Sequence, residues 1–345
     1  MPEHCFERPR GRVIELSIES AALAGNRLGD PATRTVAVYL PADAEGQRLP
    51  LLVDLAAFTG SGLKRLAWTA FGQSVPQRID RLIAEGRMGP VAVAFPDGFT
   101  SLGGNQYLDS PTLGRWERFL VEEMLPRLEA ELPILPGPAH RAVVGKSSGG
   151  YGALVQGMRH AEHWAAVACH SGDMGFANLY LRDFPATLDT LARHGGIAPF
   201  LEHVRSTPAL RGSDFHTLMI LAMGASYDPD PDPSAPAGIR LPVDLHTCAL
   251  DPERWAAWLA HDPVEQVERP EVRSALSSLR LLWLDCGRHD QYFLHYGARQ
   301  LAAALRRHGI AHRYEEFDGT HSGIDHRLDV SLPRLYEAIT GAPTS

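Results

Sequence analysis

The sequence predicts an α/β fold with a mostly parallel sheet covered by helices on both faces, and two observations support this prediction. Short apolar runs, of the kind that strands form when both faces are covered, recur along the chain. Most of them are followed by a stretch in which apolar residues have helical spacing. Strands that alternate with helices in this way build a parallel sheet. With 345 residues, the chain is long enough for one large domain or two small ones.

The first elements expected along the chain are two segments, residues 11–20 and 33–40, in which apolar and polar residues alternate. Turn-forming residues separate them, so we expect an antiparallel pair at a sheet edge. Buried strands are expected next at residues 51–55 and 90–96, with helical spacing between them at residues 63–86.

The central part of the chain continues the same alternation. Apolar residues in 112–131 lie mostly three and four positions apart, which predicts a helix that Pro126 can kink. A strand, a sharp turn and a helix are expected within residues 141–160, followed by a buried strand at 164–170.

The end of the chain supplies the last elements of the predicted sheet. Strands are expected at residues 279–287 and 312–317, and helices at 291–308 and 325–339. These elements extend the parallel arrangement to the end of the sequence.

The segment between residues 174 and 278 does not follow this rhythm, because it holds helical patches around a turn-rich tract. A long insertion after a sheet strand usually lies over the strand ends, where ligands bind. We therefore predict an α/β core formed by residues 1–173 and 279–345, with a lid or cap insertion at 174–278. A surface elaboration with no role in substrate binding is the alternative. Five aromatic residues of the insertion either line a pocket or form its own core: Phe176, Tyr180, Phe184, Trp255 and Trp258.

Charge and composition narrow the classes of partner. The net charge is −8 and the basic residues are scattered, which argues against nucleic acid or an anionic membrane surface. The first residues lack the apolar stretch of a leader, and no run of about 18 apolar residues follows. We expect a cytoplasmic protein that acts on a small molecule, and the sequence leaves open whether it forms a homo-oligomer.

Cysteine and histidine spacing gives no sign of a metal or a cofactor. Cys5, Cys169, Cys248 and Cys286 lie far apart, which predicts free thiols, with Cys169 and Cys286 buried in strands. The 16 histidines show no metal-binding spacing. The sequence therefore predicts neither a metal site nor a cofactor.

The motif that indicates chemistry is at residues 145–150, which read Gly-Lys-Ser-Ser-Gly-Gly between a strand and a helix. G-x-S-x-G in this context is a nucleophile elbow, which exposes the serine hydroxyl at the apex of a strained turn. Glycine is needed beside the serine because Cβ atoms would collide with the neighbouring strand and helix. A phosphate loop is excluded because His140 stands where that motif requires glycine. Ser147 is therefore the candidate nucleophile.

A serine hydroxyl is a weak nucleophile at neutral pH, so Ser147 needs a histidine base and a carboxylate that orients it. In enzymes with this elbow, the acid and then the histidine follow the serine along the chain. His321 lies in a loop of small residues after the last predicted strand and is the favoured base. His312 opens a strand and His326 lies in the last helix, which makes them weaker candidates.

The candidate acid lies after the penultimate strand. Asp290 follows Gly287 in a loop just before a helix, from which its side chain can turn toward His321. A helix N-cap is its alternative role. Asp285, at the end of the strand, and His289 remain open as substitutes.

Two backbone N–H groups are expected to form an oxyanion hole, which stabilises negative charge on the attacked carbonyl oxygen. One belongs to the residue after the nucleophile, Ser148, and the other to the loop after the third strand, which points to Phe58.

Three stretches of the sequence point to one family: the elbow at 145–153, the tract Phe-Pro-Asp-Gly-Phe-Thr at 95–100 and the run Asp-Cys-Gly-Arg-His-Asp at 285–290. Together they resemble the esterase branch of the α/β hydrolases, which includes enterochelin esterase, S-formylglutathione hydrolase (esterase D) and the mycolyl transferases. The resemblance implies an α/β-hydrolase fold and a triad of Ser147, Asp290 and His321. It also matches Phe58 to the residue after the family's His-Gly pair, which is replaced here by Ala-Ala at 56–57.

The sequence thus predicts a serine esterase that cleaves carboxylic esters through an acyl-enzyme. An acyltransferase would use the same triad, and a non-catalytic binding protein of this fold is the alternative from another class.

Overall fold

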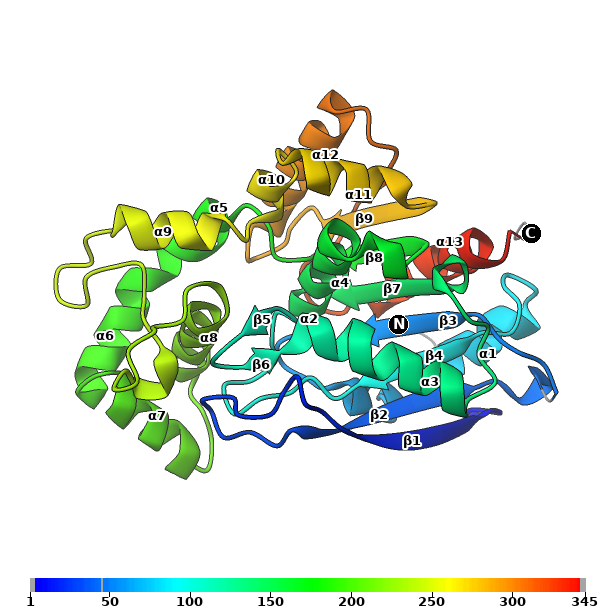
Figure 1. Ribbon diagram of the computed structural model, residues 1–345, viewed down its shortest axis with the longest axis horizontal. Coiled ribbons are helices and arrows are strands. Elements are labelled where there is room, and N and C mark those ends of the chain that lie inside the picture. The colour runs from blue at the N-terminus through cyan, green and yellow to red at the C-terminus, as the bar shows by residue number, and fades with distance from the viewer. Residues whose placement is uncertain (1–3, 45, 342–345) are drawn as a thin grey trace.

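The strands of the computed structural model, which describes residues 4–44 and 46–341, form one large sheet and one small hairpin (Figure 1). They are β1 (Arg12–Glu19), β2 (Thr33–Leu40), β3 (Leu51–Leu55), β4 (Ala92–Pro96), β5 (Asp109–Ser110), β6 (Gly114–Arg115), β7 (Arg141–Lys146), β8 (Ala166–His170), β9 (Leu281–Gly287) and β10 (Arg313–Phe317). The large sheet has the order β1-β2-β4-β3-β7-β8-β9-β10. Only the β1–β2 and β2–β4 pairings in it are antiparallel. The predicted mostly parallel α/β fold is therefore confirmed.

The predicted edge pair and buried strands follow from their residue patterns. β1 lies at the sheet edge and pairs with β2, for example Ile14 with Val38. β3, β4 and β8 are buried at every residue, because helices cover both faces of the sheet.

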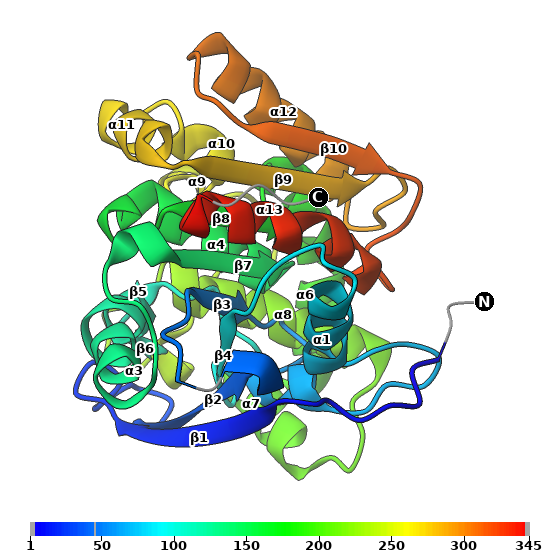
Figure 2. The ribbon, with the colours of Figure 1, turned by 90° about the vertical axis from the view of Figure 1, so that its right-hand side faces the viewer.

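Helices of the core segments lie on opposite faces of the sheet. They are α1 (Val75–Ala84), α2 (Trp116–Arg118), α3 (Leu125–Glu131), α4 (Ser148–Arg159), α12 (Leu294–Arg307) and α13 (Leu328–Thr340). α1 and α13 pack on one face, and Figure 2 shows α13 in front of the sheet, over β8. α2, α3, α4 and α12 pack on the other face. Successive strand residues therefore alternate between two apolar clusters, as Val143 and Val144 do.

The helix predicted at residues 112–131 starts later and is less regular than expected. Residues before Trp116 form the β5–β6 hairpin, and a π-helical turn over Phe119–Met124 separates α2 from α3. The N–H of Leu125 donates to the carbonyl of Leu120, five residues back. Pro126 follows directly and lacks an N–H, so the regular ladder of i to i−4 hydrogen bonds is interrupted at this point.

The insertion is more helical than the sequence pattern predicts. Its helices are α5 (Phe176–Tyr180), α6 (Phe184–His194), α7 (Ile197–Ser206), α8 (Gly212–Tyr227), α9 (Pro252–Leu259), α10 (Pro263–Gln266) and α11 (Pro270–Ser278). Sequence analysis missed α8 because its second half, residues 220–227, is buried on all sides and has no polar face. α10 and α11 are short helices and were missed as well.

The insertion divides into two parts by position. Figure 1 shows α6 to α9 beyond the carboxyl ends of β3 and β7, at the left of the view. α10 and α11 instead pack on α4, beside the sheet. Apolar side chains of the insertion, such as Phe184 and Leu276, belong to the same buried cluster as Val143 of β7. The division into core and lid remains a prediction.

The aromatic residues of the insertion are buried, but they belong to the apolar cluster that includes Val143 of β7 and not to a separate core of the insertion. Phe184 and Tyr180 each meet the ring of Trp258 edge to face, with centroids 5.7 and 5.5 Å apart. Cys169 and Cys286 are buried as predicted. None of the described helices combines the length and the apolar character needed to cross a membrane.

Candidate active site

The turn between β7 and α4 holds Ser147 at its apex. Ser147 has φ 56° and ψ −127°, a backbone conformation that residues other than glycine rarely adopt. A Cβ on Gly145 would lie 2.1 Å from the carbonyl oxygen of Gly149, and one on Gly149 would lie 1.9 Å from the carbonyl oxygen of Leu55. Both positions therefore need glycine, and this close approach of helix and strand fixes Ser147 at the strand end.

The structure brings the three predicted site residues together. Nε2 of His321 lies 3.0 Å from Oγ of Ser147, and Nδ1 of His321 lies 2.8 Å from Oδ2 of Asp290. His321 comes from the loop after β10, and Asp290 from the loop between β9 and α12. We call this series of contacts the reactive chain.

Neighbouring groups hold the acid and the histidine in place. The backbone N–H of Tyr292 donates to Oδ1 of Asp290 over 2.9 Å, and the buried Asp290 thus has a partner on each oxygen. The backbone N–H of His321 donates to Oε1 of Gln291 over 3.0 Å. The ring of Tyr292 meets the His321 ring edge to face at 4.8 Å. Sequence analysis did not find Gln291 and Tyr292, although both directly follow Asp290.

Asp285, the alternative acid, points away from His321 and belongs to a second series of contacts. Its Oδ1 lies 2.8 Å from Nδ1 of His170, and Nε2 of His170 lies 2.9 Å from Oγ of Ser331. Nε of Arg327 donates to Oδ2 of Asp285 over 2.9 Å. Asp285, His170 and Ser331 are all buried, and we call them the buried chain.

The alternative histidines have other partners. His289 pairs with Asp318 on the surface, with Nε2 and Oδ1 3.3 Å apart. His312 and His326 each place Nδ1 near a backbone carbonyl. Within the described residues, none of the three contacts Ser147.

Phe58 and Ser148, whose N–H groups were predicted to bind an oxyanion, line the same cavity as Ser147. No hydrogen-bond partner of either N–H is found among the described residues. The carbonyl of Phe58 accepts the N–H of Gly104 over 2.7 Å. A Cβ on Gly104 would lie 2.5 Å from Cα of Phe58, so glycine allows this loop to pack beside the turn.

The cavity at Ser147, which we call the catalytic cavity, has a volume of about 160 Å³. The insertion, the loop after β9 and α12 all contribute apolar or aromatic side chains to its wall, which also carries polar groups. The apolar and aromatic residues from these segments are Leu179, Tyr180, Phe215, Met219, Tyr292 and Leu294.

A buried carboxylate that sequence analysis missed also lines the catalytic cavity. Asp173 accepts hydrogen bonds from Nε2 of Gln106 over 2.8 Å and from the Tyr180 hydroxyl over 3.2 Å. Burial raises the pKa of Asp173 above its ordinary value, although both hydrogen bonds act against that rise. Its position directly after β8, at the edge where parallel strands end, was the available signal.

One group of potential metal ligands lies in the insertion, away from the catalytic cavity. Ligand atoms of His194, His203 and Asp214 lie within 4.8 Å of one another. None of these three residues lines the catalytic cavity.

A family model described as "Putative esterase" matches residues 27–330. Two curated relatives are Esterase MT1326 of Mycobacterium tuberculosis strain CDC 1551 / Oshkosh and Esterase Rv1288 of strain ATCC 25618 / H37Rv. Each is 32% identical over 88 residues, which cover 24% of this chain and 18% of the relative. The match therefore spans less than one fifth of the length of these relatives.

Solved structures are similar over nearly the whole chain. A ferulic acid esterase has a TM-score of 0.61 at 20% identity, covering 95% of this chain and 99% of that one. The fluorophosphonate-binding serine hydrolase FphF of Staphylococcus aureus has 0.58 at 14% identity, covering 95% and 98%. An S-formylglutathione hydrolase from Agrobacterium tumefaciens has 0.56 at 15% identity, covering 96% and 97%. Likeness at these identities is a likeness of fold, and it confirms the predicted α/β-hydrolase architecture.

Proposed function

Since the chain belongs to this esterase family, we propose that it is a carboxylic ester hydrolase in which Ser147, His321 and Asp290 form the catalytic triad. The observation that carries the proposal is the reactive chain, which begins at a serine on the wall of a cavity. A serine, a base within hydrogen-bond reach and an acid that orients the base are the three groups that acyl transfer to a serine requires.

The proposed reaction proceeds through an acyl-enzyme. The Ser147 oxygen bonds to the ester carbonyl carbon while its proton passes to Nε2 of His321. Asp290 stabilises the resulting imidazolium, which returns the proton to the alcohol oxygen as the ester bond breaks. Water, deprotonated by the same histidine, then attacks the acyl carbon, and His321 returns the proton to the Ser147 oxygen as the acyl group leaves as an acid.

Two backbone groups supply the electrostatic part of the mechanism. The unpaired N–H groups of Phe58 and Ser148 donate to the carbonyl oxygen as negative charge develops on it. Removal of one such donor in other serine hydrolases costs about 10²- to 10³-fold in kcat.

We propose that the acyl group is small or flat. The catalytic cavity has a volume of about 160 Å³, and polar and aromatic side chains share its wall. The names of the similar structures, a ferulic acid esterase and an S-formylglutathione hydrolase, suggest the acyl groups to test first: an aromatic acid and a formyl group. The partner in this proposal is a small-molecule ester, in the cytoplasmic location predicted from the sequence.

The first test is labelling with a fluorophosphonate, followed by intact-mass measurement. We expect a single adduct on the wild type and on Ser331→Ala, and none on Ser147→Ala. Ser331→Ala is the matched control because it removes a serine hydroxyl from the other Ser-His-Asp series. A folded wild-type protein that gives no adduct would exclude an activated Ser147 and favour the non-catalytic binding protein.

A panel of p-nitrophenyl esters of increasing acyl length then measures the size of the acyl pocket. The same assay with an added alcohol separates hydrolysis from acyl transfer, because transfer yields a new ester in place of the free acid. Acid as the main product supports the proposal, and ester as the main product replaces it with an acyltransferase.

A further inference from the structure

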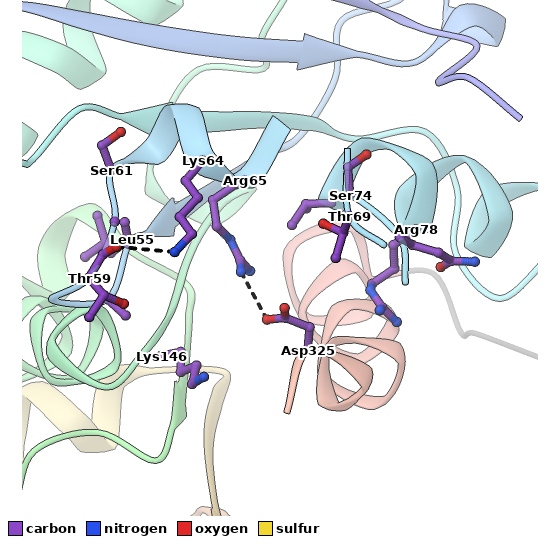
Figure 3. A pocket seen from close by; sticks show the side chains of 15 residues that line it. Leu55, Thr59, Ser61, Lys64, Arg65, Thr69, Ser74, Arg78, Lys146 and Asp325 are labelled. Atoms are coloured by element: carbon purple, nitrogen blue, oxygen red, sulfur yellow. Dashed lines mark hydrogen bonds and ion pairs between the residues drawn. The ribbon is translucent and has the colours of Figure 1, made fainter. Parts of the chain in front are cut away.

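A second cavity, of about 230 Å³, lies beside the catalytic cavity (Figure 3). Ala57, Thr59 and Lys146 line both cavities. The second cavity extends from there along residues 55–78 to Asp325. We call it the basic cavity, because four of its wall residues are cationic: Lys64, Arg65, Arg78 and Lys146.

The two arginines of the basic cavity already have carboxylate partners. Nε of Arg65 donates to Oδ2 of Asp54 over 2.8 Å, and its Nη1 donates to Oδ1 of Asp325 over 3.1 Å. Arg78 forms an ion pair with Asp329. These ion pairs hold the cavity walls in place, and they balance most of the positive charge of the two arginines.

The two lysines are different. Nζ of Lys64 donates to the carbonyl of Thr59 over 3.3 Å, and no carboxylate forms an ion pair with it in the described residues. Lys146 is half-buried, and no hydrogen bond or ion pair to its ammonium is found in that part of the chain. Figure 3 shows the ends of Lys64, Arg65 and Lys146 facing one space.

The choice of residue type is itself unusual here. The chain has 33 lysine and arginine residues, and only two of them are lysines. Both lysines line the basic cavity. Lysine offers a compact charge with three rotatable donors on a flexible stem, whereas arginine presents a fixed planar fork. Both lysine side chains of this chain thus line a cavity next to its candidate nucleophile.

We propose that the basic cavity binds an anionic group, a carboxylate or a phosphate, at one end of the ester substrate. Lys146 precedes Ser147 directly, so an ester whose carbonyl carbon lies at Ser147 can place a charge a few bonds away beside the Lys146 ammonium. Thr59 and Ser61 also line this cavity. This inference rests on the proposed function and names the substrate class of the same site.

The electrostatics of Lys146 agree with this role. Burial lowers the pKa of Lys146, and the positive charges of Arg65 and Lys64 act in the same direction, against the attraction of Asp325 and Asp290. A bound anion would offset this cost by pairing with the ammonium. The pocket is therefore better suited to an anion than to a neutral or cationic group.

The test compares kcat/KM for two matched pairs of esters. In the first pair the charge is on the acyl half: mono-p-nitrophenyl glutarate against p-nitrophenyl valerate. In the second pair it is on the alcohol half: the butyrate ester of 4-hydroxybutanoate against butyl butyrate. We expect the anionic member of one pair to be favoured about tenfold or more, which is the usual size of a charge-assisted hydrogen bond. The pair that shows the preference identifies which half of the ester enters the basic cavity.

Three variants connect the preference to the cavity. We expect Lys146→Met to lower the ratio of anionic to neutral kcat/KM about tenfold, Lys146→Arg to keep most of it, and Lys64→Met to lower it less. Arg127→Met is the matched control because it removes one positive charge from an exposed site on α3. An equal rate within both ester pairs, or a ratio that Lys146→Met leaves unchanged, would overturn the proposal.

A binding measurement without turnover separates this inference from the proposed function. Reductive ¹³C-methylation keeps the charge of both lysines and gives one NMR signal for each lysine side chain. The signal that disappears in Lys64→Arg belongs to Lys64, and the other belongs to Lys146. Glutarate titrated into methylated Ser147→Ala is expected to shift the Lys146 signal saturably. If the wild type hydrolyses neutral esters but glutarate causes no saturable shift, the anionic subsite is contradicted and the proposed reaction is not. If glutarate causes the shift but the wild type hydrolyses no ester, the proposed reaction is contradicted and the anion site is retained.

Discussion

The reactive chain and the buried chain have almost the same internal geometry. Histidine to serine distances are 3.0 and 2.9 Å, and histidine to aspartate distances are 2.8 Å in both. Their surroundings differ. Ser147 sits at a strained turn on a cavity wall, whereas Ser331 lies inside α13 and has no exposed surface. Distances alone therefore do not distinguish a nucleophilic serine from a structural one. The distinction comes from access of a substrate to the hydroxyl and from free N–H donors beside it.

The two acids differ as well. Asp290 accepts a hydrogen bond from the backbone N–H of Tyr292, whereas Asp285 accepts from Arg327 and from the indole N–H of Trp283. Burial acts to raise the pKa of Asp285, but His170 and Arg327 outweigh it and hold the pKa below its ordinary value. The buried chain thus connects β8, β9 and α13 through a charged network, and we assign it to stability.

The largest expected difference between the two chains is at the serines. Ser147→Ala is expected to lower kcat/KM for a p-nitrophenyl ester by about 10⁶-fold, as in other triad enzymes. Ser331→Ala is expected to keep activity within a few-fold and to lower the free energy of unfolding by about 1–3 kcal/mol, because it leaves the buried Nε2 of His170 without its hydrogen-bond partner. Steady-state kinetics and urea unfolding measure both. A large loss of activity in folded Ser331→Ala would refute the division of roles.

The next difference is at the aspartates. Asp290→Asn is expected to lower kcat by about 10⁴-fold, because an amide no longer favours the required tautomer of His321. Asp285→Asn is expected to keep most of the activity of the folded enzyme. It is expected to lower the free energy of unfolding by about 3–5 kcal/mol, since Arg327 loses a buried partner. The comparison fails if Asp285→Asn folds with wild-type stability.

The stability supplied by Asp285 is expected to depend on pH. Its pKa in the folded protein is depressed below the ordinary 3.8, so its contribution is complete above that value and is lost as pH falls through the folded pKa. The unfolding free-energy difference between wild type and Asp285→Asn is therefore expected to be constant near neutral pH and to shrink below about pH 4. Urea unfolding from pH 3 to 7 measures it, and a gap that widens toward acid would reverse the sign assigned here.

The smallest difference concerns the groups that position each chain. Gln291→Ala removes the acceptor for the His321 N–H at an exposed site and is expected to lower kcat/KM about threefold without destabilising the protein. Trp283→Phe removes a donor to Asp285 and is expected to lower the free energy of unfolding by about 2 kcal/mol with little effect on kcat/KM. Equal effects of both variants on activity would show that the two chains are coupled.

Local sequence patterns carried most of the site prediction. The glycines at 145 and 149 require no knowledge of distant residues, since the turn itself demands them. The choice between Asp285 and Asp290 could not be made from sequence, because both flank one strand end and the pairing of β8 with β9 turns Asp285 toward His170. The catalytic roles of Ser147, Asp290 and His321 remain predictions.

Features assembled from distant segments could not be predicted. The basic cavity combines residues 55–78 with Lys146 and Asp325, which no sequence window contains together. α8 escaped detection because complete burial of its second half removes the polar face on which helical periodicity depends. The fold class was accessible because every buried strand of a covered parallel sheet has the same apolar signature.

The shared apolar cluster of the insertion and the sheet has a consequence for folding cooperativity. Because Phe184 and Leu276 pack in the same buried cluster as Val143, neither part keeps its core when the other unfolds. Calorimetry is therefore expected to show one transition, with equal calorimetric and van't Hoff enthalpies. Movement over Ser147 would then be confined to side chains and short loops, since a rigid swing of the whole insertion would expose a core.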